Sequence, residues 1–234
     1  MRSQPSAQPS AGRRVWRNWA GTATATPARW SRPHNEAEIC AAVKDAAAAG
    51  LTVRALGSGH SFTAAAATSG VALDMSGWTG ITAADTASGL VTVRSGTTLR
   101  ALNAELSGLG LAMANLGDID AQTVSGAIST GTHGTGSGLG GIATQVAGLE
   151  LVLADGSVVS CSADKNPDLF SAGMSLGRAR PRRHSVPKPA FSITSNSQNR
   201  RQAGSAGGTG GTGVPSAASW LVSRLFRLTR AWRP

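Results

Sequence analysis

Apolar residues recur every three or four positions in two stretches of the chain, and this spacing predicts two helices. The first covers residues 36–49: Asn35 can cap its first turn, two glutamates lie where a helix N-terminus favours negative charge, and Gly50 ends it. The second covers residues 98–108, where three leucines share one side. A shorter helix is predicted to begin at Pro167, because proline suits the first helical position.

Short apolar runs between these helices predict strands at residues 53–56, 71–73 and 90–94. A longer apolar stretch, residues 145–161, is interrupted by Asp155-Gly156, a pair typical of a tight turn, and is interpreted as a β-hairpin. Helices alternate with strands, but hairpin signals are frequent. The pattern therefore favours an α+β fold over a doubly wound parallel sheet.

The strand predicted at residues 53–56 ends abruptly at Gly57-Ser58-Gly59, and His60 follows. Two glycines let backbone N–H groups turn toward one point without a Cβ in the way, which is how a chain cradles phosphate oxygens. This turn lacks the third glycine and the helix of a dinucleotide-binding fingerprint, and it lacks the lysine of a Walker A loop. It is therefore either a phosphate cradle in another fold or a plain connecting turn.

A second stretch, residues 117–141, is rich in glycine and in hydroxyl side chains. Within it, residues 123–129 can form one or two helical turns with Val124 and Ile128 inward. The remainder offers many hydrogen-bond donors and little bulk, which suits the wall of a ligand site, although a flexible glycine-rich loop has the same composition. His133 is interpreted either as a site residue or as a satisfied structural histidine.

Composition bounds the class of protein. With 234 residues, 41% of them hydrophobic, the chain can build a real core. No apolar run approaches the roughly 20 residues of a membrane span, and the N-terminus lacks the apolar segment of a signal peptide, so we expect a cytoplasmic protein. Cys40 and Cys161 lie in apolar-patterned segments and are expected to be buried, reduced thiols. No metal site is expected.

Charge divides the chain into two unlike pieces. Residues 1–177 contain 11 Lys or Arg and all 12 Asp or Glu, whereas residues 178–234 contain 11 Lys or Arg and no acidic residue. The predicted boundary therefore falls at Gly177. A start rich in Ser, Pro and Ala predicts a disordered N-terminus over residues 1–17, so the folded domain is expected to cover residues 18–177.

Two motifs together resemble a known family. R-A-L-G-S-G-H-S-F at residues 54–62 and S-G-A-I-S-T-G-T-H-G-T-G at residues 125–136 resemble the FAD-binding domain of the vanillyl-alcohol-oxidase, or PCMH, type. Within this type they resemble the branch of the L-gulono- and D-arabinono-1,4-lactone oxidases, with the alditol oxidases nearby. The W-x-N-W from Trp16 and the P-x-x-x-x-E-I from Pro33 fit the same branch. The resemblance covers about residues 18–176 and implies two α+β subdomains that bind FAD.

The resemblance implies a site. Residues 54–61 would wrap the FAD pyrophosphate with backbone N–H groups, and His60 corresponds to the histidine that many members join covalently to the flavin, while other members leave it unattached. Thr123 would lie near the flavin, and the catalytic residues are not identified. The residues expected to bind the cofactor are Arg54, Ala55, Leu56, Gly57, Ser58, Gly59, His60, Ser61, Gly117, Thr123, Ser125, Gly126, Ser129, Thr132, His133 and Gly134.

The resemblance also implies a reaction. A hydride would leave the carbinol carbon of a sugar lactone for flavin N5 while a base takes the hydroxyl proton, and oxygen or a cytochrome-like carrier would accept the electrons. Three other functions stay open. One is a non-catalytic fragment that binds FAD or nothing stably, another is an alditol oxidase, and the third is a bacterial cell-wall UDP-sugar reductase with a related FAD domain. The H-S-F after Gly59 and the T-G-T-H-G motif favour the lactone oxidases.

The sequence departs from the family after M-S-L-G, residues 174–177. No substrate-domain pattern follows, and residues 178–234 are interpreted as a mostly disordered, low-complexity basic tail, consistent with translation in another frame. Apolar and arginine residues at roughly helical spacing over residues 220–232 support a competing interpretation, a basic amphipathic helix in weak contact with a membrane surface. Nucleic acid binding by the arginines ranks last. We therefore expect this chain to be inactive on lactones.

Overall fold

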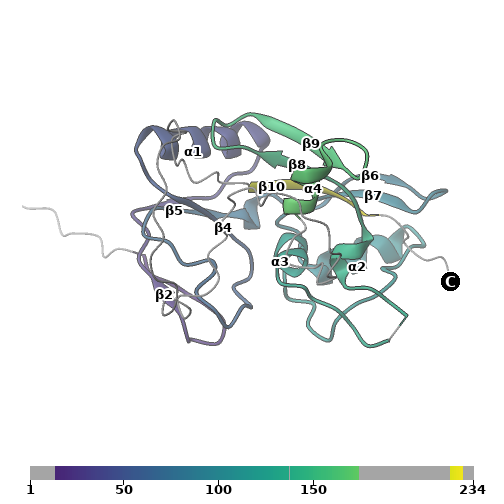
Figure 1. The fold of residues 1–234 in the computed structure, drawn as a ribbon. Helices are drawn as coiled ribbons and strands as arrows, with labels where there is room; N and C mark the ends of the chain where they lie inside the picture. Colours follow the sequence, from purple (N-terminus) through teal and green to yellow (C-terminus); the bar gives the residue numbers. More distant parts are fainter. Residues whose placement is uncertain (1–13, 137, 174–221, 229–234) are drawn as a thin grey trace, which may run out of the picture.

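The computed structural model describes residues 14–136, 138–173 and 222–228 (Figure 1). Its strands are β1 (Trp16–Arg17), β2 (Thr24–Ala25), β3 (Arg29–Ser31), β4 (Val53–Leu56), β5 (Val71–Asp74), β6 (Ile81–Asp85), β7 (Leu90–Arg94), β8 (Val146–Val152), β9 (Val158–Ser162) and β10 (Val222–Leu228). Its α-helices are α1 (Glu36–Ala48), α2 (Leu99–Gly108), α3 (Val124–Ser129) and α4 (Pro167–Gly173), and 3-10 turns cover Met75–Gly77 and Ile142–Gln145. Figure 1 shows two halves side by side, one with α1 packed on its sheet and the other with α2 and α3 packed on its sheet.

The first half is built on a three-stranded parallel sheet in the order β3-β5-β4. Parallel strands need crossover connections, and α1 supplies the one that leads from β3 to β4, on the two sides of β5. One face of α1 buries Ile39 and Val43 against the sheet residues Val71 and Leu73. Val152 of β8 belongs to the same apolar cluster, so the second half of the chain packs directly on the first.

The sequence predicts α1 correctly because its capping is local. The Asn35 side chain accepts a hydrogen bond from the Glu38 backbone N–H at 2.9 Å, and the Glu38 carboxylate accepts from the Asn35 side chain at 2.7 Å and from the His34 backbone at 2.8 Å. Gly50, with a φ of +64°, then turns the chain out of the helix. Both ends of the predicted helix are confirmed.

The second half is built on a five-stranded antiparallel sheet in the order β6-β7-β10-β8-β9. Helices α2 and α3 lie on one face of this sheet (Figure 1). Their leucine and isoleucine side chains share one apolar cluster with the strands. Its largest fully buried members are Leu99, Leu102, Leu106, Ile128, Ile142 and Leu151.

The predicted hairpin is confirmed as β8 and β9, paired from Gly148 opposite Ser162 to Val152 opposite Val158. Its turn depends on Asp155, whose carboxylate accepts hydrogen bonds from the Ser157 hydroxyl at 2.6 Å and the Ser157 N–H at 2.8 Å. These bonds, led by that of the hydroxyl, lower the pKa of Asp155.

Strand β10 corrects the interpretation of the tail. Its seven residues pair antiparallel with both β7 and β8, and the Cα of Phe226 lies opposite Val93 on one side and Leu149 on the other. An amphipathic helix over residues 220–232 is therefore wrong for the part that the structure describes, because residues 222–228 complete a sheet. The rest of the predicted tail lies outside the described residues.

The expectation of mixed helices and strands is confirmed, with three differences. Strands β1, β2, β3 and β6 were not predicted, because the first three have only two or three residues and β6 carries little apolar pattern. The predicted N-terminal disorder is wrong for Trp16 and Arg17, which pair with Ala25 and Thr24. Both cysteines are free, but only Cys161 is buried, and burial raises the pKa of its thiol. No helix in the described part could cross a membrane.

Candidate functional site

The two motifs singled out in the sequence meet in the structure. Gly57 follows β4 directly and lies so close to Thr123 that a Cβ added at Gly57 would overlap the Thr123 hydroxyl. Thr123 is the N-cap of α3 and is 5% exposed. Stretches more than 60 residues apart in sequence are therefore in contact, and only glycine fits at the point where they touch.

The loop after β4 leaves its backbone donors unused. Among the described residues, no protein atom accepts from the backbone N–H of Ser58, Gly59, His60 or Ser61, while the carbonyls of Gly59 and Ser61 both accept hydrogen bonds. Gly59 has a φ of +69°, a conformation that other residues rarely adopt. Consecutive N–H groups without an acceptor in the described structure, beside such a glycine, are the donor set that an anion cradle requires, and this loop is called the N–H cradle below.

The segment Asn18-Trp19 holds this loop from outside. The Asn18 side-chain amide donates to the Ser61 carbonyl at 2.8 Å and to the Thr22 hydroxyl at 2.8 Å, and its oxygen accepts from the Ala23 N–H at 2.9 Å. The Trp19 N–H donates to the Gly59 carbonyl at 2.9 Å. Asn18 is only 2% exposed, so these bonds are made inside the protein.

Sequence reasoning noted the W-x-N-W motif but gave its asparagine no role. A buried asparagine must satisfy its amide, and a partner 43 residues further along the chain cannot be inferred from spacing. The signal that could have found it is the polar Asn18 itself, placed between two tryptophans just before a tight turn.

His60 stacks on Trp19. The centroids of the two rings are 5.0 Å apart and their planes differ by 17°. Phe62 meets the same indole edge-on, with centroids 6.0 Å apart. Trp19 and Phe62 are 64% and 69% exposed, so this aromatic group lies at the surface beside the N–H cradle.

Helix α3 is fixed to the loop between β7 and α2. The Thr123 hydroxyl accepts from the Gly126 N–H at 3.2 Å, which caps the helix. The Ser125 hydroxyl donates to the Ser95 carbonyl at 3.0 Å, and the Val124 N–H donates to the Thr97 carbonyl at 2.8 Å. The predicted residues Thr123, Ser125 and Gly126 therefore form one rigid wall beside Gly57.

The glycine-rich stretch after α3 is tied down rather than loose. A Cβ added at Gly134 would overlap the Leu116 carbonyl and the Asn115 side chain, so segments 115–117 and 132–134 lie against each other. The Asn115 amide donates to the Gly140 carbonyl at 3.0 Å, and the amide of Gln145 donates to the Asn115 carbonyl at 3.1 Å. These contacts favour an ordered wall over the plain flexible-loop alternative for the residues that make them.

His133 does not join His60. Its Nδ1 lies 3.0 Å from the Gly134 carbonyl oxygen, and its side chain is exposed, so both interpretations of this histidine stay open. The roles of Gly117, Ser129 and Thr132 in cofactor binding stay predictions. The same holds for Arg54, Ala55 and Leu56, which belong to β4, where Leu56 is buried in an apolar cluster with Trp16.

An ion pair fixes the segment that precedes Thr123. Both nitrogens Nε and Nη2 of Arg100 on α2 donate to the Asp120 carboxylate, at 3.0 and 2.9 Å. The side-chain hydrogen bond from Arg100 lowers the pKa of Asp120. The Arg100 N–H also donates to the Asp120 carbonyl at 2.9 Å, so the segment before α3 is held at both backbone and side chain.

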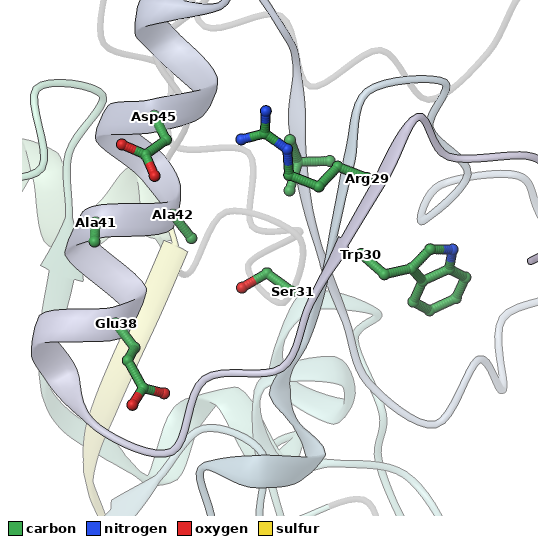
Figure 2. Close-up of a pocket in the computed structure, with 8 residues that line it drawn as sticks. Arg29, Trp30, Ser31, Glu38, Ala41, Ala42 and Asp45 are labelled. Atoms are coloured by element: carbon green, nitrogen blue, oxygen red, sulfur yellow. The ribbon is translucent and has the colours of Figure 1, made fainter.

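A cavity of about 260 Å³ lies elsewhere, between α1 and β3 (Figure 2). Figure 2 shows Glu38 and Asp45 of α1 across from Arg29 and Ser31 of β3, with Trp30 pointing away. None of the lining residues belongs to either motif. In the cradle, Gly57 and Ser58 are exposed, and residues 59–61 are half-buried. The described residues contain no cluster of potential metal ligands.

Comparisons with known proteins identify the family of the chain. Residues 27–162 match the family described as FAD binding domain, which is more than half of the chain. The chain is similar to L-gulono-1,4-lactone dehydrogenase of Mycobacterium tuberculosis, with 42% identity over 163 residues that cover 70% of this chain and 38% of the relative. It is similar to D-arabinono-1,4-lactone oxidase of Yarrowia lipolytica, with 37% identity over 69% of this chain and 32% of the relative.

It is also similar to L-gulonolactone oxidase of Mus musculus, with 36% identity over 67% of this chain and 36% of the relative. The chain thus spans less than two fifths of the length of these relatives. The matched region includes the N–H cradle, the Gly57–Thr123 contact and α3, and the cofactor predicted for these residues is FAD. This chain belongs to the FAD binding domain family and carries a domain of the PCMH type.

Proposed function

We propose that the loop after β4 and the wall formed by α3 together bind FAD in an oxidoreductase that acts on a sugar 1,4-lactone. The observation that carries the proposal is the run of backbone N–H groups from Ser58 to Ser61, for which the described residues supply no acceptor, in a loop fixed by Asn18 and Trp19. Neutral backbone donors suit the two phosphates of a dinucleotide and need no lysine. Because Gly57 has no side chain, the wall formed by α3 can approach the loop after β4 closely.

When bound, the flavin accepts a hydride from the carbinol carbon of the substrate. The residues of this chain would bind and orient it. The cradle holds the diphosphate, Thr123 and α3 limit the space on the opposite side, and His60 stands at the mouth of the cradle as the candidate attachment point.

The substrate and the electron acceptor are proposed from the relatives. Their names specify L-gulono-1,4-lactone or D-arabinono-1,4-lactone, which we propose as the substrates of the whole protein, with oxygen or a cytochrome-like carrier as acceptor. The region matched here is the FAD-binding domain. We therefore propose that the 234-residue chain binds FAD but does not turn over lactone by itself.

A pair of glycine variants tests the cofactor site. Gly57→Ala places a methyl group against Thr123, so we expect FAD affinity to fall by about tenfold or more, measured by titration of the apoprotein. Gly108→Ala, at the end of α2, is the matched control, since a Cβ there meets nothing within 4 Å. Thermal unfolding of both variants separates lost affinity from lost folding. A wild-type chain that takes up no FAD would contradict the proposal.

The same loaded protein then tests turnover. We expect its absorbance at about 450 nm, where oxidised flavin absorbs, to persist when either lactone is added without oxygen. Bleaching at a catalytic rate would contradict the proposed inactivity while leaving FAD binding intact.

A further inference from the structure

Three contacts surround His60, and all come from two adjacent residues. The Trp19 N–H holds the Gly59 carbonyl at 2.9 Å, the Asn18 amide holds the Ser61 carbonyl at 2.8 Å, and the Trp19 indole stacks on the imidazole itself. The backbone is thus fixed on both sides of His60 and the ring is fixed between them. A histidine at the surface of a glycine-rich loop would otherwise sample several rotamers.

Burial does not explain where Trp19 lies. Its side chain is 64% exposed, whereas the neighbouring Trp16 is 8% exposed and belongs to an apolar cluster with Leu56. An exposed tryptophan gains little from removal of apolar surface from water. Its closest aromatic partner is His60, with the rings nearly parallel. The position is therefore better explained by what the indole does to the imidazole.

We propose that Trp19 is a positioning residue for His60: its indole holds the imidazole in the orientation needed for covalent attachment of the flavin. The inference rests on the proposed binding of FAD to this loop. Trp19 acts through His60 and needs no contact with the flavin, and Asn18 assists by fixing the backbone at Ser61.

In the attachment step, atoms and electrons balance when dioxygen is the oxidant. A bond forms between an imidazole nitrogen of His60 and the carbon of a methyl group on the flavin's benzenoid ring. One C–H bond of that methyl group and the N–H bond of the imidazole break. The two electrons and two protons released reduce dioxygen to hydrogen peroxide. The step requires the nitrogen lone pair to point at the methyl carbon, and stacking on Trp19 restricts the ring to one plane.

The test follows attachment over time in the full chain. Apoprotein is mixed with FAD in air, samples are digested with trypsin, and mass spectrometry gives the fraction of peptide 55–94 that carries flavin. We expect Trp19→Ala to bind FAD with unchanged affinity but to attach it about tenfold more slowly or worse. Trp19→Phe, which keeps an aromatic face, should recover the wild-type rate to within about threefold.

Phe62→Ala is the matched control. It removes an equally exposed ring that touches Trp19 but is not stacked on His60, and we expect attachment within about twofold of wild type. Circular dichroism and the FAD dissociation constant establish that each variant is folded.

Three results would overturn the inference, and they differ from one another. Attachment by Trp19→Ala at the wild-type rate would remove Trp19 from the role. A wild-type chain that binds FAD and attaches none would remove covalent attachment while leaving the FAD site. A wild-type chain that binds no FAD would remove the proposed function as well.

Discussion

Asn18 shows how much one buried side chain can do for a binding loop. It makes three hydrogen bonds at 2.8 to 2.9 Å, one of them to the loop that ends the cradle, and it is almost completely buried. The Ser61 carbonyl is hydrogen-bonded to Asn18 and the Gly59 carbonyl to Trp19, so the loop's carbonyls are engaged within the protein. Its N–H groups are left for a ligand. The shape of the cradle therefore depends on a residue that need not touch the ligand.

Truncating this residue should weaken both folding and binding. Asn18→Ala leaves the Ser61 carbonyl and the Ala23 N–H without their partner, and we expect a loss of about 2 kcal/mol in the free energy of unfolding. FAD affinity should fall as well, because the loop loses the hydrogen bond that fixes the Ser61 carbonyl. Urea unfolding measures the first effect and FAD titration the second.

Asn103→Ala provides the comparison, since Asn103 lies on α2, is half-buried and makes no side-chain hydrogen bond in the described structure. An equally large loss of unfolding free energy in Asn103→Ala would show that the effect is not specific to the hydrogen bonds of Asn18.

At the scale of elements, the sequence predicted what is decided locally. Helix α1 and the β8–β9 hairpin are determined by residues within a few positions, such as Asn35 with Glu38 and Asp155 with Ser157. Strand β6 was missed because four of its five residues are exposed, so no alternation marks it. The contact of Gly57 with Thr123 joins two motifs that were each identified, but their meeting depends on packing between the halves. Local patterns cannot encode that distance.

The link between α2 and the segment before α3 gives a pH-dependent prediction. The pKa of Asp120 is lowered by the hydrogen bond from Arg100, so the pair contributes stability above the ordinary carboxyl value of 3.8. That contribution is lost as the pH falls below 3.8 through the lowered pKa of the folded state. We expect Asp120→Asn to be less stable than wild type at pH 7, and the difference to shrink at pH about 3.

Unfolding by urea at both pH values measures this difference. Asp164→Asn is the control, because Asp164 is exposed and its carboxylate has no hydrogen-bond partner in the described structure. A deficit of Asp120→Asn that is equal at the two pH values would show that the ion pair is not its source.

At the scale of the whole molecule, the strongly basic last quarter of the sequence contributes to the fold. Strand β10 comes from this part and lies in the middle of the five-stranded sheet, between strands that are distant from it in sequence. Charge composition separated residues 178–234 from the rest, but backbone pairing does not depend on charge. The division in charge composition is therefore not a division in structure. Weak contact of the tail with a membrane surface stays a proposal, and in it residues 222–228 would remain paired in the sheet as β10.

Backbone pairing of β10 can be tested with proline. The Cα of Leu225 lies opposite Arg94 of β7 and Glu150 of β8, so Leu225→Pro places a residue without an N–H group in a central strand. We expect a lower melting temperature and increased binding of a hydrophobic dye, because β7 and β8 would each be left with an unpaired edge over the α2–α3 core. The wild-type chain serves as the comparison. A melting temperature of Leu225→Pro equal to that of wild type would mean that β10 does not support the sheet, and that the second half of the domain is stable with β7 and β8 unbridged.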